Sequence, residues 1–150
     1  MIHHLSLPAE NPEHVATVLA EILDGKVTPL FPNTGTYAAW SKDDYGTAIE
    51  IYPYGFTMQP GKDDAPVEMV NNTHKASHTE CHAAISVALD TEALLSIAKR
   101  EGWRALEHNR GPFRVVEFWL ENRVLIEFFT PEMEKEYTTA VTSFARDAWD

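Results

Sequence analysis

Residues 49–53 read IEIYP and residues 126–131 read IEFFTP, so a glutamate stands inside an apolar, strand-forming run twice in one chain. A charged side chain in such a run is costly to bury unless it is paired or bound to a metal ion. Glu50 and Glu127 therefore both need a partner, and the similar residues around them indicate that they occupy equivalent places.

The two glutamates belong to an internal repeat that covers most of the chain. His4 precedes the first glutamate by 46 residues, and His82 precedes the second by 45. Two glycine pairs keep nearly the same offset, so that all corresponding landmarks are 76 to 78 residues apart; the pairs are Gly25 with Gly102 and Gly35 with Gly111. A doubled unit gains a shared core that one copy could not build alone. We therefore predict two similar modules.

The first module predicts the order strand, helix, strand, strand, strand. Asn11 as the cap and Pro12 at the first position begin the helix, and Gly25 ends it. Its apolar residues recur at helical spacing, at Val15, Val18, Leu19, Ile22 and Leu23. Strands are expected at residues 2–7, where Pro8 ends the strand, and at 26–31, 36–41 and 47–52.

The second module repeats this order. A strand is expected at residues 81–89, and Asp90 or Thr91 caps a helix that Gly102 terminates. Further strands are expected at 103–107, 113–120 and 124–129, with a turn at 121–123. A last helix begins at Thr130-Pro131, and its apolar side needs a partner surface, either its own sheet or a second subunit.

These elements predict one domain over residues 1–150. The first module spans about 1–54, the second about 80–131, and the last helix 132–149. Glycine, proline, aspartate and asparagine interrupt any periodicity in residues 55–79, which we interpret as a linker or a long functional loop.

Composition narrows the classes of partner. The net charge of −11 argues against nucleic acid and anionic membranes, which rely on Lys and Arg. No apolar run is long enough to span a membrane, and the start shows no signal peptide. The single cysteine, Cys81, fits a reducing compartment. We therefore expect a cytoplasmic protein that binds neither nucleic acid nor a membrane.

Strand alternation groups the candidate site residues. His4 and Ser6 share one face of their strand, and His82 shares a face with Ala84 and Ser86. Glu50 and Glu127 point away from their aliphatic neighbours. If both modules curve into one cup, all four histidine and glutamate side chains can converge at its centre.

This layout resembles the vicinal oxygen chelate superfamily, also called the glyoxalase/bleomycin-resistance/dioxygenase superfamily. The segments that carry the resemblance are HLSL at 4–7, TAIEI at 47–51, HAAISV at 82–87 and VLIEF at 124–128. It covers residues 1 to about 131. It implies an α+β fold, in which two βαβββ modules form a curved, cup-like mixed sheet with helices on the outside, followed here by a C-terminal helix. By position, the family's metal ligands correspond to His4, Glu50, His82 and Glu127.

Two imidazoles and two carboxylates suit one divalent ion among Zn²⁺, Ni²⁺, Fe²⁺, Mn²⁺ and Co²⁺. The set is most similar to that of glyoxalase I, which implies an isomerase or lyase acting on a small oxygenated substrate chelated to the metal. A carboxylate that leaves the metal becomes a general base, with Glu127 as the first choice and Glu50 as the second. A loop of 55–79 and a helix after the second module are additions to a minimal member, and no glutathione-binding set of basic residues is recognisable.

Alternatives remain open at this point. If Glu50 does not bind, two histidines and Glu127 form a facial triad suited to an Fe(II) extradiol-type dioxygenase, or to a thiol transferase of the same superfamily. A non-enzymatic protein of this fold could hold a small apolar ligand. The resemblance also implies a homodimer, sometimes with modules paired across chains, so the site can form within one chain or between two.

Three further residues are candidates for substrate binding. Ser6 lies two residues from His4 on the same face, and Trp40 can line the cup, although core packing is the competing interpretation for Trp40 and Tyr37. Arg114 is expected to share a face with Glu127 if the turn at 121–123 preserves parity, where it would anchor substrate or pair with a glutamate. His3 is the competitor of His4 as a ligand.

Overall fold

The computed structural model describes residues 3–30, 35–44, 46–59, 68–71 and 82–147. The chain divides into two compact units, Met1–His78 and Thr79–Asp150. The described residues form three helices, two mixed four-stranded sheets and one two-stranded sheet, and neither four-stranded sheet closes into a barrel. The expected α+β fold with a C-terminal helix is confirmed.

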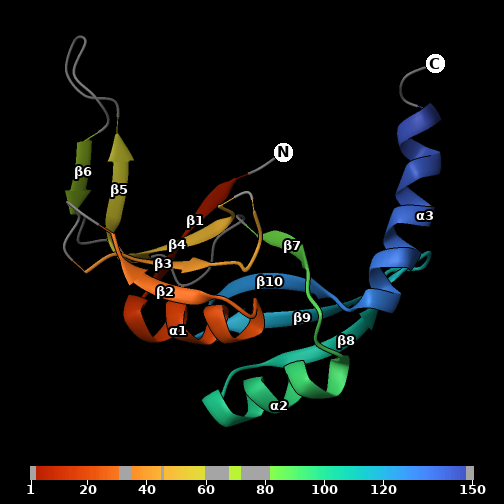
Figure 1. Ribbon diagram of the computed structural model, residues 1–150, viewed down its shortest axis with the longest axis horizontal. Coiled ribbons are helices and arrows are strands. Elements are labelled where there is room, and N and C mark those ends of the chain that lie inside the picture. The colour runs from red at the N-terminus through yellow and green to blue at the C-terminus, as the bar shows by residue number, and fades with distance from the viewer. Residues whose placement is uncertain (1–2, 31–34, 45, 60–67, 72–81, 148–150) are drawn as a thin grey trace. The chain divides into compact units, whose positions relative to one another are not determined.

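The first unit contains the expected strand, helix and three strands (Figure 1). The sheet order is β1-β4-β3-β2, with β1 parallel to β4 and the other pairs antiparallel. The elements are β1 His4–Ala9, α1 Pro12–Ile22, β2 Lys26–Pro29, β3 Tyr37–Trp40 and β4 Ala48–Pro53.

Helix α1 begins where the sequence predicts, because the Asn11 side chain accepts a hydrogen bond from the backbone N–H of His14. The helix covers one face of the sheet, and its buried residues include Val15 and Leu19. Leu7 and Ile51 meet it from the strands and are also buried. The opposite face of the sheet therefore carries the alternate residues, among them His4 and Glu50.

The end of α1 differs in detail from the prediction. Asp24, with φ of 50°, takes the left-handed conformation expected of a glycine after a helix. Gly25 is required for another reason: a Cβ there would lie 1.6 Å from the carbonyl oxygen of Trp40. Gly25 therefore permits close approach between the end of α1 and β3.

Two strand predictions in this unit are corrected. Strand β1 does not end at Pro8 but continues to Ala9, with Pro8 paired to Tyr52. Because β1 lies at the edge of its sheet, a residue without an N–H is tolerated there. The predicted linker at 55–79 contains an antiparallel hairpin, β5 Phe56–Gln59 and β6 Glu68–Asn71. The chain breakers at 60–66 follow β5 and lie outside the described residues.

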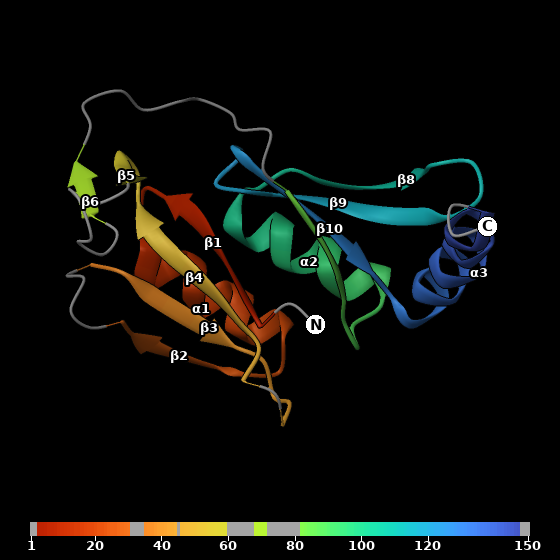
Figure 2. The ribbon, with the colours of Figure 1, turned by 90° about the horizontal axis from the view of Figure 1, so that it is seen from above.

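The second unit repeats the topology of the first, with the order β7-β10-β9-β8 and β7 parallel to β10 (Figure 2). The predicted repeat is therefore confirmed by the strand order. The elements are β7 Ala83–Ser86, α2 Thr91–Glu101, β8 Ala105–Asn109, β9 Arg114–Leu120, β10 Val124–Phe129 and α3 Pro131–Asp147. Strand β7 is shorter than the predicted 81–89, and Cys81 lies outside the described residues.

Local signals set both ends of α2. The Asp90 side chain accepts from the backbone N–H of Ala93, and Gly102 closes the helix in the left-handed conformation with φ of 71°. Leu94 is fully buried with the sheet residues Phe118 and Phe128, whose rings meet edge to face. This core occupies the face of the second sheet opposite to Glu127.

Helix α3 contacts β9 and β10 of its own unit. Met133 is buried, and Tyr137 stacks on Phe129 with ring centroids 4.6 Å apart. Part of its apolar side is thus covered by its own sheet, which is one of the two predicted partners. The apolar residues of this helix from Val141 onward have side chains that lie outside the described part of the structure. No helix among the described residues is long and apolar enough to cross a membrane.

Candidate metal centre

The first unit brings His4 and Glu50 together on the sheet face opposite α1. In the parallel pair of β1 and β4, His4 lies opposite Ala48 and Ser6 lies opposite Glu50. His4 Nε2 is 4.0 Å from Glu50 Oε1, and the glutamate side chain is 20% exposed. One imidazole and one carboxylate thus point toward the same space at the end of β1.

Two hydroxyl groups hold the other oxygen of Glu50. Ser6 and Tyr52 each donate a hydrogen bond to Oε2, both at 3.2 Å. Both donors are neutral, and no Arg or Lys among the described residues pairs with Glu50. Oε1 is left directed toward His4, where it can bind a cation or accept a proton.

The second unit presents an equivalent pair. Glu127 lies opposite Ala84 in the parallel pair of β7 and β10, as Glu50 lies opposite Ser6. His82 precedes Ala84 by two residues, as His4 precedes Ser6, and its side chain is exposed just before β7 begins. His82 therefore precedes the residue opposite Glu127 by the same two positions by which His4 precedes the residue opposite Glu50.

The surroundings of Glu127 differ from those of Glu50. Glu117 lies directly opposite Glu127 in the antiparallel pair of β9 and β10, and both side chains are 15% exposed. One nitrogen of Arg110 donates to both carboxylates, at 2.5 Å to Glu117 Oε1 and 2.8 Å to Glu127 Oε1. His108 Nε2 lies 3.6 Å from Glu117 Oε2. Arg110 therefore bridges a pair of facing carboxylates.

The hydrogen bond to Glu127 and, after it, the one to Glu117 raise the pKa of Arg110, although partial burial acts in the opposite direction. The guanidinium is thus held in its charged form by these two glutamates.

Each unit supplies two candidate ligands. Within each unit, the described residues form no cluster of three or more His, Cys, Asp and Glu side chains arranged to hold a metal ion. A four-ligand centre would therefore need both pairs.

Arg114 does not share a face with Glu127, which corrects the sequence prediction. The turn after β9 contains three residues, and Glu121 and Asn122 adopt positive φ of 49° and 58°. Leu120 consequently pairs with Val124, and this register places Glu117, not Arg114, on the face of Glu127.

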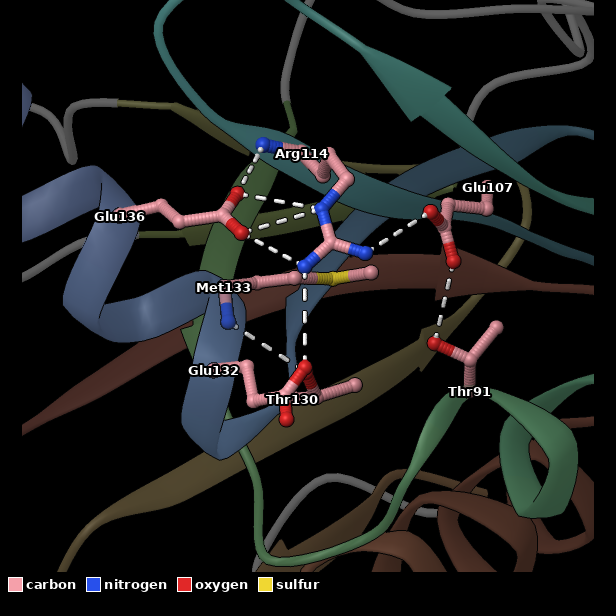
Figure 3. Close-up of polar contacts among 7 residues, drawn as sticks. All are labelled: Thr91, Glu107, Arg114, Thr130, Glu132, Met133 and Glu136. Atoms are coloured by element: carbon pink, nitrogen blue, oxygen red, sulfur yellow. Dashed lines mark hydrogen bonds and ion pairs between the residues drawn. The ribbon is translucent and has the colours of Figure 1, made fainter.

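Arg114 instead links α3 to the sheet through hydrogen bonds and ion pairs (Figure 3). Its Nη2 donates to Glu136 Oε1 at 2.6 Å, and its Nη1 donates to Glu107 at 3.3 Å. The Glu136 carboxylate, whose pKa Arg114 lowers through this hydrogen bond, also accepts from the Arg114 backbone N–H. Glu107 in turn accepts from Thr91 of α2. These contacts occupy the guanidinium, so we leave Arg114 out of the proposed substrate site.

The remaining candidates divide between the two faces of the first sheet. Trp40 lies opposite Ala48 and therefore on the face of His4 and Glu50, with its indole N–H bonded to Thr28. Tyr37 lies on the α1 face, where its hydroxyl donates to Glu13 at 3.2 Å, and this hydrogen bond raises the pKa of Tyr37. His3, outside β1, is exposed.

Three residues that contact Glu50 or Glu127, or bridge to them, were not predicted from the sequence: Tyr52, Arg110 and Glu117. Glu117 carries the signal used for Glu50, a charge inside the apolar run VVEFW at 115–119. Tyr52 shares the face of Glu50 by strand alternation. Arg110 sits beside a glycine turn and gives no sequence signal of its contacts.

Comparison with known proteins supports the architecture. No protein-family model matches the chain, and no curated protein matches its sequence. Among solved structures, the fosfomycin resistance protein FosX from Listeria monocytogenes superposes with a TM-score of 0.58 at 13% identity, over 91% of this chain and 94% of that chain. Glyoxalase I from Leishmania major gives 0.56 at 11% identity, over 98% of each. A glyoxylase/bleomycin resistance protein/dioxygenase domain from Frankia sp. EAN1pec gives 0.55 at 14%, over 87% and 96%.

The chain has the vicinal oxygen chelate fold. Identities of 11 to 14% show the fold alone and not an activity. The pairs β1/β4 and β7/β10 are the equivalent strands of the two modules; the first carries His4 and Glu50, and the second carries Glu127, with His82 directly before β7.

Proposed function

We propose that this protein is a divalent-metal-dependent, glyoxalase-like enzyme, an isomerase or lyase of a small oxygenated substrate. His4, Glu50, His82 and Glu127 would hold one metal ion. The observation that carries this proposal is the matched register: Glu50 opposite Ser6 and Glu127 opposite Ala84, each with a histidine two residues before its strand partner.

The donor set fits such an ion. It consists of imidazole nitrogen and carboxylate oxygen without thiolate, which suits Zn²⁺, Ni²⁺, Fe²⁺, Mn²⁺ or Co²⁺ and does not choose among them. His4 and Glu50 approach each other to 4.0 Å without a hydrogen bond between them, which leaves both donor atoms directed at a common point. The two pairs can meet within one chain or between two copies of a homodimer.

The fold relatives give support of a general kind. FosX is described in complex with Mn(II) and sulfate, and the Leishmania glyoxalase I is trypanothione-dependent. Metal dependence in proteins of this fold therefore supports a divalent ion here, while their different substrates leave the substrate of this chain open.

The contacts suggest a division of labour between the carboxylates. When bound, the metal would supply Lewis acidity to a substrate oxygen. Glu50 is the better placed general base, because Oε1 accepts no hydrogen bond from the described residues while Ser6 and Tyr52 fix Oε2. It would take a proton from the carbon beside the polarised oxygen. Glu127, the first choice by resemblance, has its Oε1 occupied by Arg110. Ser6 and Trp40 would contact the substrate from the same face.

Metal content of tag-free protein tests this proposal, measured by elemental analysis for the parent and for His82→Ala and Glu127→Ala. We expect about one equivalent of a divalent transition metal in the parent and its loss in both variants. His14→Ala, a histidine exposed on α1, is the matched control and should retain the metal. A parent that binds no metal after reconstitution with Zn²⁺, Ni²⁺, Mn²⁺, Co²⁺ or Fe²⁺ would overturn the proposal and leave a small-ligand-binding protein.

Substrate assays then separate the chemistries. Metal-loaded parent is tested with hemithioacetals, the substrate class of a glyoxalase-like isomerase. Oxygen uptake with catechols after anaerobic iron loading would instead identify a dioxygenase. If Glu50 is the general base, Glu50→Gln should abolish turnover. Unchanged turnover in this variant would show that Glu50 is not the base.

A further inference from the structure

Arg110 holds Glu127 through Oε1, one of the two oxygens through which that carboxylate could bind a metal ion. One of its nitrogens lies 2.8 Å from Glu127 Oε1 and 2.5 Å from Glu117 Oε1, so a single positive group bridges two carboxylates. A divalent ion bound to Glu127 needs an oxygen of the same carboxylate and carries charge of the same sign as the guanidinium. The guanidinium and an ion bound through Oε1 therefore compete for the same oxygen of Glu127.

Facing carboxylates explain why a cation is needed when no metal is bound. Glu117 and Glu127 are direct cross-strand partners, and like charges in this relation destabilise a sheet. Both side chains are mostly withdrawn from water, so their repulsion is screened less than on the surface. Arg110 offsets this repulsion.

The first unit shows that the fold does not require this arrangement. Ala38 lies opposite Glu50 where Glu117 lies opposite Glu127. Glu50 is held by two neutral hydroxyls in place of a guanidinium. An arginine and a second glutamate, Arg110 and Glu117, are therefore found beside Glu127 but not beside Glu50.

Arg110 has room to move away from Glu127. It lies outside the strands, in the turn between β8 and β9, where its backbone N–H bonds to Phe113 and Gly111 follows with φ of 94°. Its side chain is 39% exposed. Glu117 can retain the guanidinium after the contact with Glu127 is broken.

We propose that Arg110 is a resident counter-ion that a metal ion displaces from Glu127 onto Glu117. This inference rests on the proposed function, because it takes Glu127 as a metal ligand. Arg110 thereby weakens metal binding and ties the occupancy of the centre to the position of the β8–β9 turn. Glu117 acts as the receiving residue for the displaced side chain.

Metal affinity of the full chain tests the inference, measured by calorimetric titration of metal-free protein with Zn²⁺ and Mn²⁺. Arg110→Gln removes the competitor and should tighten binding. We expect a change of about tenfold, equal in size to the smaller losses that follow mutation of residues contacting metal ligands. Glu117→Gln removes the receiving carboxylate and should weaken binding. Arg104→Gln, which removes an equal charge from an exposed position at the opposite end of β8, is the control and should leave affinity nearly unchanged.

Salt and spectroscopy distinguish displacement from a through-space effect of charge. If Arg110 competes directly, Arg110→Gln should tighten metal binding equally at about 0.15 M and at about 1 M salt. If Arg110 acts only as a distant charge, the difference in affinity should disappear at about 1 M salt, where charges are screened within about 3 Å. Side-chain NMR signals of Arg110, assigned by their loss in Arg110→Gln, should shift when Zn²⁺ is added to the parent.

The outcomes separate this inference from the proposed function. Tighter binding in Arg110→Gln at both salt concentrations, with the Zn²⁺-dependent shift, supports displacement. Weaker or unchanged binding in Arg110→Gln, with a parent that still binds metal through His82 and Glu127, overturns displacement alone and makes Arg110 a positioning residue. A parent that binds neither ion overturns both.

Discussion

Ser6 lies directly opposite Glu50 across the parallel strands β1 and β4, and its hydroxyl donates to Glu50 Oε2 at 3.2 Å. Tyr52, two residues further along β4, donates to the same oxygen at the same distance. Two neutral donors on one oxygen fix the orientation of the carboxylate. The other oxygen is then presented to His4 and to whatever binds beside it.

Loss of the Tyr52 hydroxyl should therefore weaken metal binding more than it weakens the fold. We expect Tyr52→Phe to lower metal affinity by about tenfold, because groups that orient a ligand typically contribute that much. Tyr37→Phe is the matched control, since that hydroxyl bonds Glu13 on the α1 face. Calorimetric titration with Zn²⁺ and a urea midpoint for each variant provide the comparison. Equal affinities for the two variants would show that Tyr52 does not position Glu50.

The two repeat-equivalent glycines should respond differently to alanine. Gly102→Ala places a side chain at φ of 71° in open space, which costs about 1–2 kcal/mol. Gly25→Ala places a Cβ on the carbonyl oxygen of Trp40 and forces the end of α1 away from β3. We expect a loss of about 3 kcal/mol or more in the free energy of unfolding. Urea unfolding of both variants measures the difference, and similar costs would mean that the close approach at Gly25 is not limiting.

The contact between α3 and β9 should depend on pH in the acid range. Arg114 lowers the pKa of Glu136 from its usual 4.5, so the folded carboxylate stays ionised where the unfolded one is protonated. Its stabilisation is present above pH 4.5 and is lost as pH falls through the folded value. The parent should therefore exceed Glu136→Gln in stability at pH 7, and the two should converge in acid.

Urea midpoints between pH 7 and about pH 3 measure that convergence, since carboxyl groups titrate over this interval. Glu134→Gln, exposed on the same helix, is the control and should follow the parent. A gap between parent and Glu136→Gln that stays constant with pH would contradict a role for the ionised carboxylate.

Signals that act over a few residues were readable from the sequence. Asn11 and Asp90 accept hydrogen bonds from the first turn of their helices, and Gly102 adopts the left-handed conformation. The repeated spacing of His and Glu predicted two modules, which the matching strand orders confirm. The helix-capping signals are reliable because each depends on residues within a few positions.

Signals that depend on the length of a turn were not readable. The three-residue turn at 121–123 decides which residues of β9 face Glu127, and one residue more or less would exchange the faces. Arg114 was assigned to the wrong face for this reason. The contact of Arg110 with Glu127, 17 residues away, follows from the same register and could not be derived before it.

Both His–Glu pairs should be needed for one metal site, and paired variants can test how the two pairs meet. His4→Ala/Glu50→Ala leaves only the second pair, and His82→Ala/Glu127→Ala leaves only the first. Each double variant alone should bind no metal at parent affinity. If the site forms between copies, mixing and refolding the two variants restores one intact site in each mixed dimer, about one quarter of all sites with random pairing. If the site forms within one chain, the mixture binds no more than its components. Elemental analysis after gel filtration reads the result directly, and a double variant that retains full metal content would exclude its pair from the centre.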